Sequence, residues 1–173
     1  MKQIYFKTTV GMLMCLVLFG CSSCCVDQYY VHPERAAGSS TIIPQGMRPT
    51  FGLLGVEAIE YGGYEEGGGK EYMTKGRQTL WSIIEGKKLR VEEYKYKLFD
   101  GTEATACLVY LPSGEMLNEL VLAEGYCYVE KNELEDHPDL LERFLKIEKE
   151  AKAKKKGGWA YWAKKEAEKK SGN

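Results

Sequence analysis

Residues 114–132 read GEMLNELVLAEGYCYVEKN, and they contain a complete transition from helix to strand. Leucine and valine recur every three or four positions, which predicts a helix over about residues 115–124. Gly125 follows at once, and glycine is the residue type that most often ends a helix. The next four residues, YCYV, predict a short strand. This stretch therefore predicts a fold that combines helices with strands.

The longest predicted helix runs from Pro138 to about Lys156. Proline is favoured in the first turn of a helix, and one apolar stripe contrasts with the Lys and Glu of the other positions. The inward positions are Leu140, Leu141, Phe144, Leu145, Glu148 and Ala151. The sequence GGWAYW then ends this helix with an aromatic anchor, and residues 163–173 are expected to form a disordered tail.

Elements of both kinds are also predicted before residue 114. They are a buried strand over 51–56, a helix over 71–85, and two strands over 87–99 and 105–111. Asp100-Gly101 is a strong hairpin signal between these last two strands. The glycine-rich residues 61–72 predict a loop, and no Gly-Lys-Ser/Thr of a phosphate-binding loop follows them. The order predicts an α+β fold in which helices cap a small curved sheet.

The chain has 173 residues, of which 44% are hydrophobic, and its formal net charge is −1. This length fits one domain with its own core. The balanced charge gives no overall signal for nucleic acid or a membrane surface. Basic residues are nevertheless concentrated over 152–156 and 164–170, so any electrostatic site has to be local.

Residues 1–20 have the features of a signal peptide. Lys2 and Lys7 precede an apolar run over 10–19, which is shorter than the roughly 20 residues of a membrane-spanning helix. The run leads into Leu-Phe-Gly-Cys, which resembles the lipobox of bacterial lipoproteins and implies acylation of Cys21. An ordinary secretory signal is the alternative. We expect a lipid anchor in the cell envelope. If the cell is Gram-negative, Ser22 after the cysteine favours the outer membrane.

Residues 21–46 are rich in Ser, Gly and Pro and are expected to form a tether with irregular structure. A strand candidate lies at 41–43. The folded domain is expected over residues 47–162. Cys107 and Cys127 lie within it, in apolar stretches, and are interpreted as small core residues or as a disulfide pair. Metal binding by cysteine is less favoured, because neither histidine lies near a cysteine pair with ligand spacing.

The order of elements and two stretches, 114–132 and LLERFLKIEKEAKAKKKGGWAYW at 140–162, resemble the staphylococcal nuclease (thermonuclease) family. Matching residues are Gly114, Asn118-Glu119, Glu124-Gly125 and Gly158-Trp159. The resemblance covers about residues 51–162. It implies a five-stranded OB-fold barrel capped by about three helices, which residues 26–50 either complete or leave open, and it implies that Asn118 is a buried hydrogen-bonding residue.

The resemblance also implies where an active site would lie. Family members hydrolyse DNA or RNA with Ca²⁺, an acidic cluster and two arginines, and their catalytic strand reads Arg-Leu-Leu-x-x-Asp-Thr/Ala-Pro-Glu. In FGLLGVEAIE, residues 51–60, the arginine position is Gly52 and the aspartate is Glu57, so that of the charged positions only Glu60 matches. The second arginine position falls within residues 102–104, where no arginine occurs. The family's Asp-Gly-Asp-Thr turn has no counterpart, since no aspartate occurs between Asp27 and Asp100.

Several residues remain candidates for chemistry or binding. Glu60 is a candidate general base, and Glu57 with Glu60 is a candidate Ca²⁺ site. Two interpretations fit Lys152, Lys154 and Lys155: a phosphate-binding patch or a solvated helix face. Tyr94 and Tyr96 form either a stacking platform for bases or ordinary cross-strand packing.

An attack on a phosphodiester adds negative charge, and guanidinium groups or a cation must stabilise it. Because these groups are missing from their expected positions, we predict a catalytically inactive, monomeric binding module without a cofactor. Its ligand would be a protein, an envelope component or nucleic acid. The alternative is a Ca²⁺-dependent nuclease that hydrolyses DNA or RNA with a rearranged active site.

Overall fold

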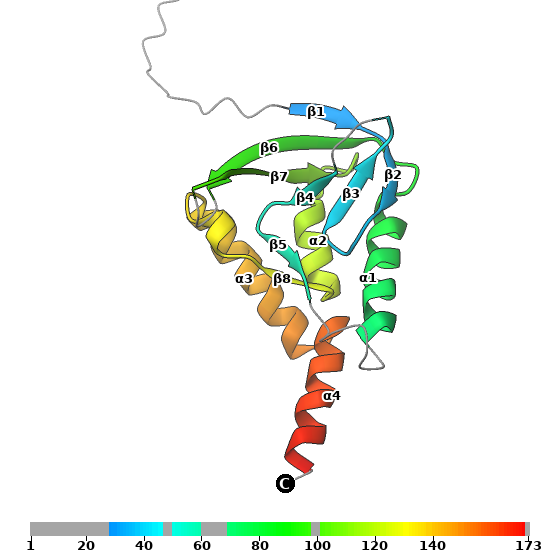
Figure 1. The fold of residues 1–173 in the computed structure, drawn as a ribbon, viewed down its shortest axis with the longest axis vertical. Coiled ribbons are helices and arrows are strands. Elements are labelled where there is room, and N and C mark those ends of the chain that lie inside the picture. The colour runs from blue at the N-terminus through cyan, green and yellow to red at the C-terminus, as the bar shows by residue number, and fades with distance from the viewer. Residues whose placement is uncertain (1–27, 47–49, 60–68, 98–100, 172–173) are drawn as a thin grey trace, which may run out of the picture.

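The computed structural model describes residues 28–46, 50–59, 69–97 and 101–171 (Figure 1). Within these ranges the strands are β1 (Gln28–Val31), β2 (Pro33–Ala36), β3 (Thr41–Pro44), β4 (Phe51–Leu53), β5 (Val56–Ala58), β6 (Leu89–Lys97), β7 (Glu103–Tyr110) and β8 (Cys127–Val129). The helices are α1 (Gly69–Ile84), α2 (Leu117–Glu124), the 3₁₀ turn η1 (Asn132–Leu134), α3 (Pro138–Ala153) and α4 (Gly158–Ser171). The predicted α+β class is confirmed.

Six strands form one sheet in the order β1-β6-β7-β4-β3-β2, and β5 pairs with β8 separately. All neighbours are antiparallel except β4 and β7, which run parallel. No ladder joins β1 to β2, so this sheet is not closed into a barrel. The chain nevertheless passes from β1 to β2 through the single residue His32, which brings the two edge strands of the sheet together. The OB-fold is therefore curled but open.

The expectation of a tether and irregular structure over 21–46 is wrong from residue 28 onward. There β1, β2 and β3 form three strands of the main sheet, and the strand candidate at 41–43 is confirmed within β3. Each of these strands has only four residues, which is too short for a clear period to mark it in the sequence. Their stability comes from pairing, since Tyr29 of β1 lies opposite Val91 of β6.

The predicted disordered tail over 163–173 is also wrong, because α4 continues to Ser171. Tyr161 is buried near its start, while the rest of the helix projects away from the sheet at the end of the molecule opposite β1 (Figure 1). Ala, Lys and Glu dominate this segment, and all three favour helix. Lys164 and Glu168 add an ion pair one turn apart. Local propensity therefore stabilises α4 where packing does not.

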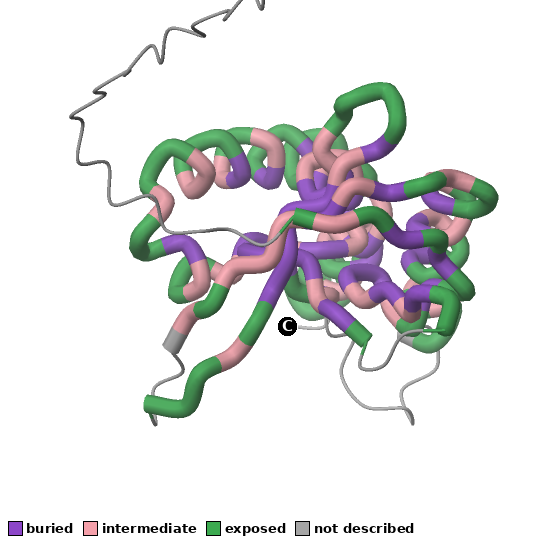
Figure 2. Tube along the Cα trace, turned by 90° about the horizontal axis from the view of Figure 1, so that it is seen from above, coloured by how far each residue is buried: buried purple, intermediate pink, exposed green. Residues whose placement is uncertain are grey.

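The core lies between the sheet and the helices. Figure 2 shows buried positions along the middle of the molecule and exposed ones around its rim. Fully buried members from β6, β7, α2 and α3 include Leu89, Val91, Val109, Leu117, Leu122 and Phe144. The predicted inward stripe of α3 is present, since Phe144, Glu148 and Ala151 are its buried residues. None of the described helices combines the length and apolar composition needed to cross a membrane.

Asn118 is the polar centre of this core and is fully buried. Its Oδ1 accepts the Val109 N–H at 3.1 Å, and its Nδ2 donates to the carbonyls of Leu54 at 3.0 Å and Cys107 at 3.1 Å. One side chain thereby joins α2 to β7 and to the residue after β4. The buried hydrogen-bonding role expected for Asn118 is confirmed.

Cys107 and Cys127 are both free and fully buried, so the disulfide alternative is wrong. Burial raises the pKa of the Cys107 thiol to about 12. Burial also raises the pKa of Cys127, and its thiol donates to the Ser39 carbonyl at 3.4 Å. Both are protonated core residues rather than reactive thiolates.

Glu148 joins α3 to β8. Its Oε1 accepts the Val129 N–H at 3.0 Å, and its Oε2 pairs with Lys152 at 2.8 Å. We expect Glu148→Ala to lower the free energy of unfolding by about 2 kcal/mol, because a buried N–H loses its acceptor. Urea unfolding measures this. The matched control Glu150→Ala removes an exposed pair with Lys154 and should change stability by less than about 0.5 kcal/mol. Equal losses in the two variants would contradict the prediction.

Candidate functional site

The segment from β4 to β5 contains the positions that the resemblance assigns to catalysis. Gly52 of β4 lies between Thr41 of β3 and Ala106 of β7. A Cβ placed on Gly52 meets nothing within 4 Å. The space next to this backbone is therefore open, and no guanidinium extends from it.

Glu57 lies on β5, opposite Tyr128 of β8, and is exposed. Its Oε1 accepts the N–H of the next residue, Ala58, at 2.9 Å. Glu60 lies outside the described residues, so its roles as general base and as a Ca²⁺ ligand stay predictions. Within the described part of the chain, no group of three or more His, Cys, Asp or Glu side chains is arranged to hold a metal.

The turn between β2 and β3 reads Gly38-Ser39-Ser40-Thr41. Both serines are about 5% exposed. The Ser40 carbonyl accepts the Leu53 N–H at 3.0 Å, which attaches the turn to β4. A Cβ on Gly76 would lie 2.3 Å from Ser39 Oγ, so α1 packs tightly on the other side. This turn therefore contacts β4 through its backbone and contains no carboxylate.

No arginine occupies the second expected position either. Residues 102–104 lie at the start of β7, where Glu103 is opposite Lys97 of β6. The structure describes four arginines. Arg90 pairs with Glu92 of its own strand, β6. Arg143 of α3 pairs with Glu119 of α2. The other two are exposed on β2 and α1.

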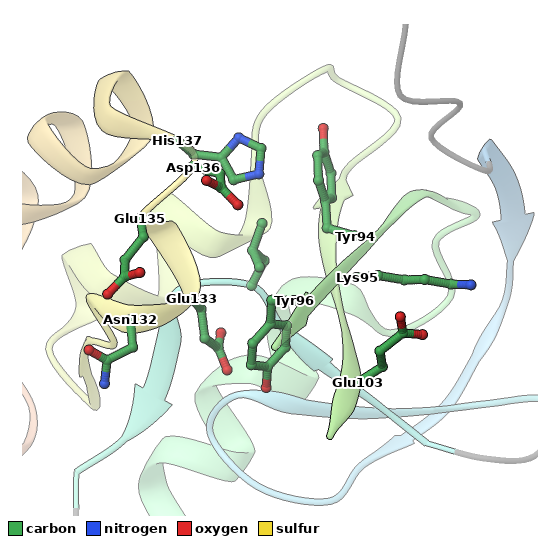
Figure 3. Close-up of a pocket in the computed structure, with 10 residues that line it drawn as sticks. Tyr94, Lys95, Tyr96, Glu103, Asn132, Glu133, Glu135, Asp136 and His137 are labelled. Atoms are coloured by element: carbon green, nitrogen blue, oxygen red, sulfur yellow. The ribbon is translucent and has the colours of Figure 1, made fainter. Parts of the chain in front are cut away.

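A cavity of about 300 Å³ opens between β6 and the segment that follows β8 (Figure 3). It is lined by Leu54, Tyr94, Lys95, Tyr96, Glu103, Asn132, Glu133, Glu135, Asp136 and His137. Four of these side chains are carboxylates, and only one is a permanent cation. The cavity is therefore an acidic site with aromatic walls.

Glu133 is a carboxylate of this cavity that two hydrogen bonds hold in place. Its Oε2 accepts the Gly55 N–H at 2.7 Å, and its side chain accepts a hydrogen bond from the Tyr96 hydroxyl. Burial raises the pKa of Glu133, the two hydrogen bonds oppose this, and the charges of Glu130 and Glu57 raise it further. Burial and the Glu133 bond raise the pKa of Tyr96 to about 12. Additional negative charge is therefore unfavourable here.

The predicted pair Tyr94 and Tyr96 lies on one face of β6, because side chains alternate along a strand. Both are half-buried and line the cavity (Figure 3). The Tyr94 ring meets the His137 ring edge to face, with 5.0 Å between centroids and 89° between planes. The structure thus brings the two tyrosines to a candidate site, but beside carboxylates rather than beside the predicted lysines.

The lysine patch lies at the other end of α3. Lys152 pairs with Glu148 and lies over the Trp159 ring at 4.3 Å, and Lys154 pairs with Glu150 at 3.7 Å. Lys155 adopts a left-handed backbone with φ of 50°. The cavity adjoins the first residue of α3, and a helix of this length spans roughly 24 Å. These lysines and the tyrosines therefore do not form one surface.

Sequence reasoning did not identify Glu133, Asp136 or His137 as site residues. Their signal is the run NELEDH at 132–137, which has three carboxylates in four residues shortly after a predicted strand. A short acidic run also fits an ordinary solvated turn. Only the position of this run opposite Tyr94 in the folded chain distinguishes a candidate site from a solvated turn.

Residues 50–161 match the model of the family described as staphylococcal nuclease homologue. None of the curated proteins matches the chain. The match covers β4 through the start of α4, and it therefore includes the segment with Gly52 and Glu57 as well as the cavity. The chain belongs to the staphylococcal nuclease homologue family.

Proposed function

We propose that this protein is a lipid-anchored component of the cell envelope whose nuclease-like domain binds a ligand without cleaving phosphodiester bonds. The observation that supports this most directly is the composition of the face around β4 and β5. Gly52 replaces a guanidinium, and carboxylates of Glu57 and Glu133 flank the segment between them.

The electrostatics of this face oppose phosphodiester chemistry. The transition state carries more negative charge than the substrate, and removing one donor to it commonly reduces the rate by about 10²–10³-fold. Here neither expected arginine position supplies a donor. Unit charges 4 Å apart at an effective dielectric constant of 20 repel by about 4 kcal/mol. A phosphate next to the Glu133 carboxylate would therefore be expelled unless a cation screened it.

The position of β1 is consistent with an anchor at Cys21. Gln28 follows that cysteine by seven residues, a connection that spans at most about 25 Å. β1 and the end of α4 lie at opposite ends of the long axis of the molecule (Figure 1). An acylated Cys21 would therefore hold the β1 end close to the membrane and direct α4 away from it.

A cleavage assay tests the catalytic part of the proposal. Residues 26–173, which contain every described element, are incubated with single-stranded DNA and with RNA, in Ca²⁺ or in EDTA. We expect no EDTA-sensitive cleavage, and the same result for Glu60→Ala. Cleavage that EDTA abolishes and Glu60→Ala removes would overturn the proposal and support the Ca²⁺-dependent nuclease. A salt-dependent mobility shift without cleavage would make nucleic acid the ligand.

Acyl labelling tests the anchor. Cells that express the full chain are grown with a radiolabelled fatty acid, and the protein should incorporate label and fractionate with membranes. Cys21→Ser should lose both properties. If the Cys21→Ser protein still carries label, the anchor assignment is wrong.

A further inference from the structure

The binding function proposed above does not say which class of ligand would enter the cavity between β6 and the segment 132–137. Its two sides differ in chemistry. β6 contributes the rings of Tyr94 and Tyr96, and the opposite segment contributes the carboxylates of Glu133 and Asp136 (Figure 3). The His137 ring meets Tyr94 at the rim.

We propose that this cavity binds an organic cation, an ammonium or guanidinium group carried by a small amine or by a basic peptide side chain. The proposal rests on the binding function proposed above and names the chemical class of its ligand. Aromatic rings and carboxylates are the two kinds of group that attract such cations, through the ring face and through charge-assisted hydrogen bonds respectively.

The first supporting observation is the balance of charge around the cavity. Glu135 and Asp136 are exposed and form no ion pair among the described residues. Glu133 is already held by two hydrogen-bond donors, but among the residues that the structure describes no cation pairs with it. Lys95 also borders the cavity, yet its side chain extends away from the 132–137 segment (Figure 3). The site therefore has unbalanced negative charge.

The second observation is the arrangement of the rings. Tyr94 is fixed by its edge-to-face contact with His137, and Tyr96 is fixed by its hydroxyl bond to Glu133. Both rings remain half-buried and line the same cavity as Asp136 and Glu133 (Figure 3). A cation there could contact an aromatic face and a carboxylate at the same time, without any rearrangement of β6.

The size of the cavity limits the ligand. A volume of about 300 Å³ is at the lower end for small-molecule sites, so it fits a side chain or a short diamine better than a nucleotide. The carboxylates also disfavour phosphate, which separates this proposal from binding of nucleic acid.

Titration of the full-length chain in detergent tests the proposal. The probes are agmatine and putrescine as cations, acetyl-Gly-Lys-Gly-amide as a peptide, and thymidine monophosphate as an anion, with binding followed by NMR shifts. We expect saturable binding of the cations that weakens at high salt. Tighter binding of the peptide than of both amines assigns a peptide ligand, and the reverse assigns a free amine. No saturation by any cation, or binding of the nucleotide alone, overturns the proposal.

Two variants locate the site. Asp136→Asn and Tyr94→Leu should each weaken cation binding by about fivefold, since each removes one attractive group. Because Asp136 is exposed, its variant should keep the wild-type thermal midpoint, which checks folding. Glu85→Gln removes an exposed carboxylate beyond α1 and should bind as wild type does. Equal weakening in Glu85→Gln would refute the site. Nuclease activity in the cleavage assay would refute the non-catalytic function but not this cation site.

Discussion

Replacing Asn118 by alanine is expected to lower the free energy of unfolding by about 3–5 kcal/mol. The side chain is fully buried and satisfies one backbone N–H and two carbonyls on different elements. Alanine leaves the Val109 N–H and the Leu54 carbonyl without these partners in a buried site, whereas the Cys107 carbonyl still accepts the Leu54 N–H at 2.8 Å. Each unpaired buried group costs about 1–3 kcal/mol, and partial relaxation of the core reduces their sum.

Urea unfolding followed by circular dichroism measures this loss, with an unchanged denaturant slope as the sign that the two end states are comparable. Gln78→Ala is the matched control, because Gln78 is an exposed amide on α1. It should change the free energy of unfolding by less than about 0.5 kcal/mol. A loss below about 1 kcal/mol in Asn118→Ala would show that the network is not needed for stability.

Gly125→Ala is expected to cost at least about 3 kcal/mol. Gly125 ends α2 with a left-handed φ of 78°, which alone costs a residue with a side chain roughly 1–2 kcal/mol. An added Cβ would also lie 2.6 Å from the carbonyl oxygen of Lys156. That backbone cannot withdraw freely, because the Gly158 N–H donates to the Gly125 carbonyl at 2.8 Å.

Gly86→Ala separates these two contributions. Gly86 follows α1 with a similar φ of 70°, but a Cβ there meets nothing within 4 Å. We therefore expect a loss of only about 1 kcal/mol from backbone strain. Thermal unfolding of both variants gives the comparison. If Gly125→Ala is no more destabilised than Gly86→Ala, the close approach of α2 to the residues after α3 does not add to the free-energy cost of the substitution.

Elements whose sequence signal lies within a few neighbouring residues were predicted well. The period of α2, its glycine end and the short strand after it are present at nearly the expected residues. The same holds for α3, where even the inward position of Glu148 was visible as part of the stripe. Helical period and capping are properties of neighbouring residues, so they can be recognised without the rest of the fold.

The elements that were missed depend on distant partners. β1 is held by β6, with Gln28 opposite Glu92, and β2 by the equally short β3. The segment α4 was missed for a different reason, since its Ala, Lys and Glu favour helix without an apolar stripe to mark it. Strand pairing across 64 residues leaves almost no trace in a four-residue segment.

For the candidate site, the sequence by itself determined what is missing from the expected positions: Gly52 and residues 102–104 contain no arginine, whatever the fold. It also determined that Tyr94 and Tyr96 share a face of one strand. Only the tertiary structure decided what faces them. Side-chain alternation is local, whereas the approach of β6 to Glu133 and Asp136 depends on how β8, η1 and α3 pack, so the acidic and aromatic cavity exists only in the folded chain.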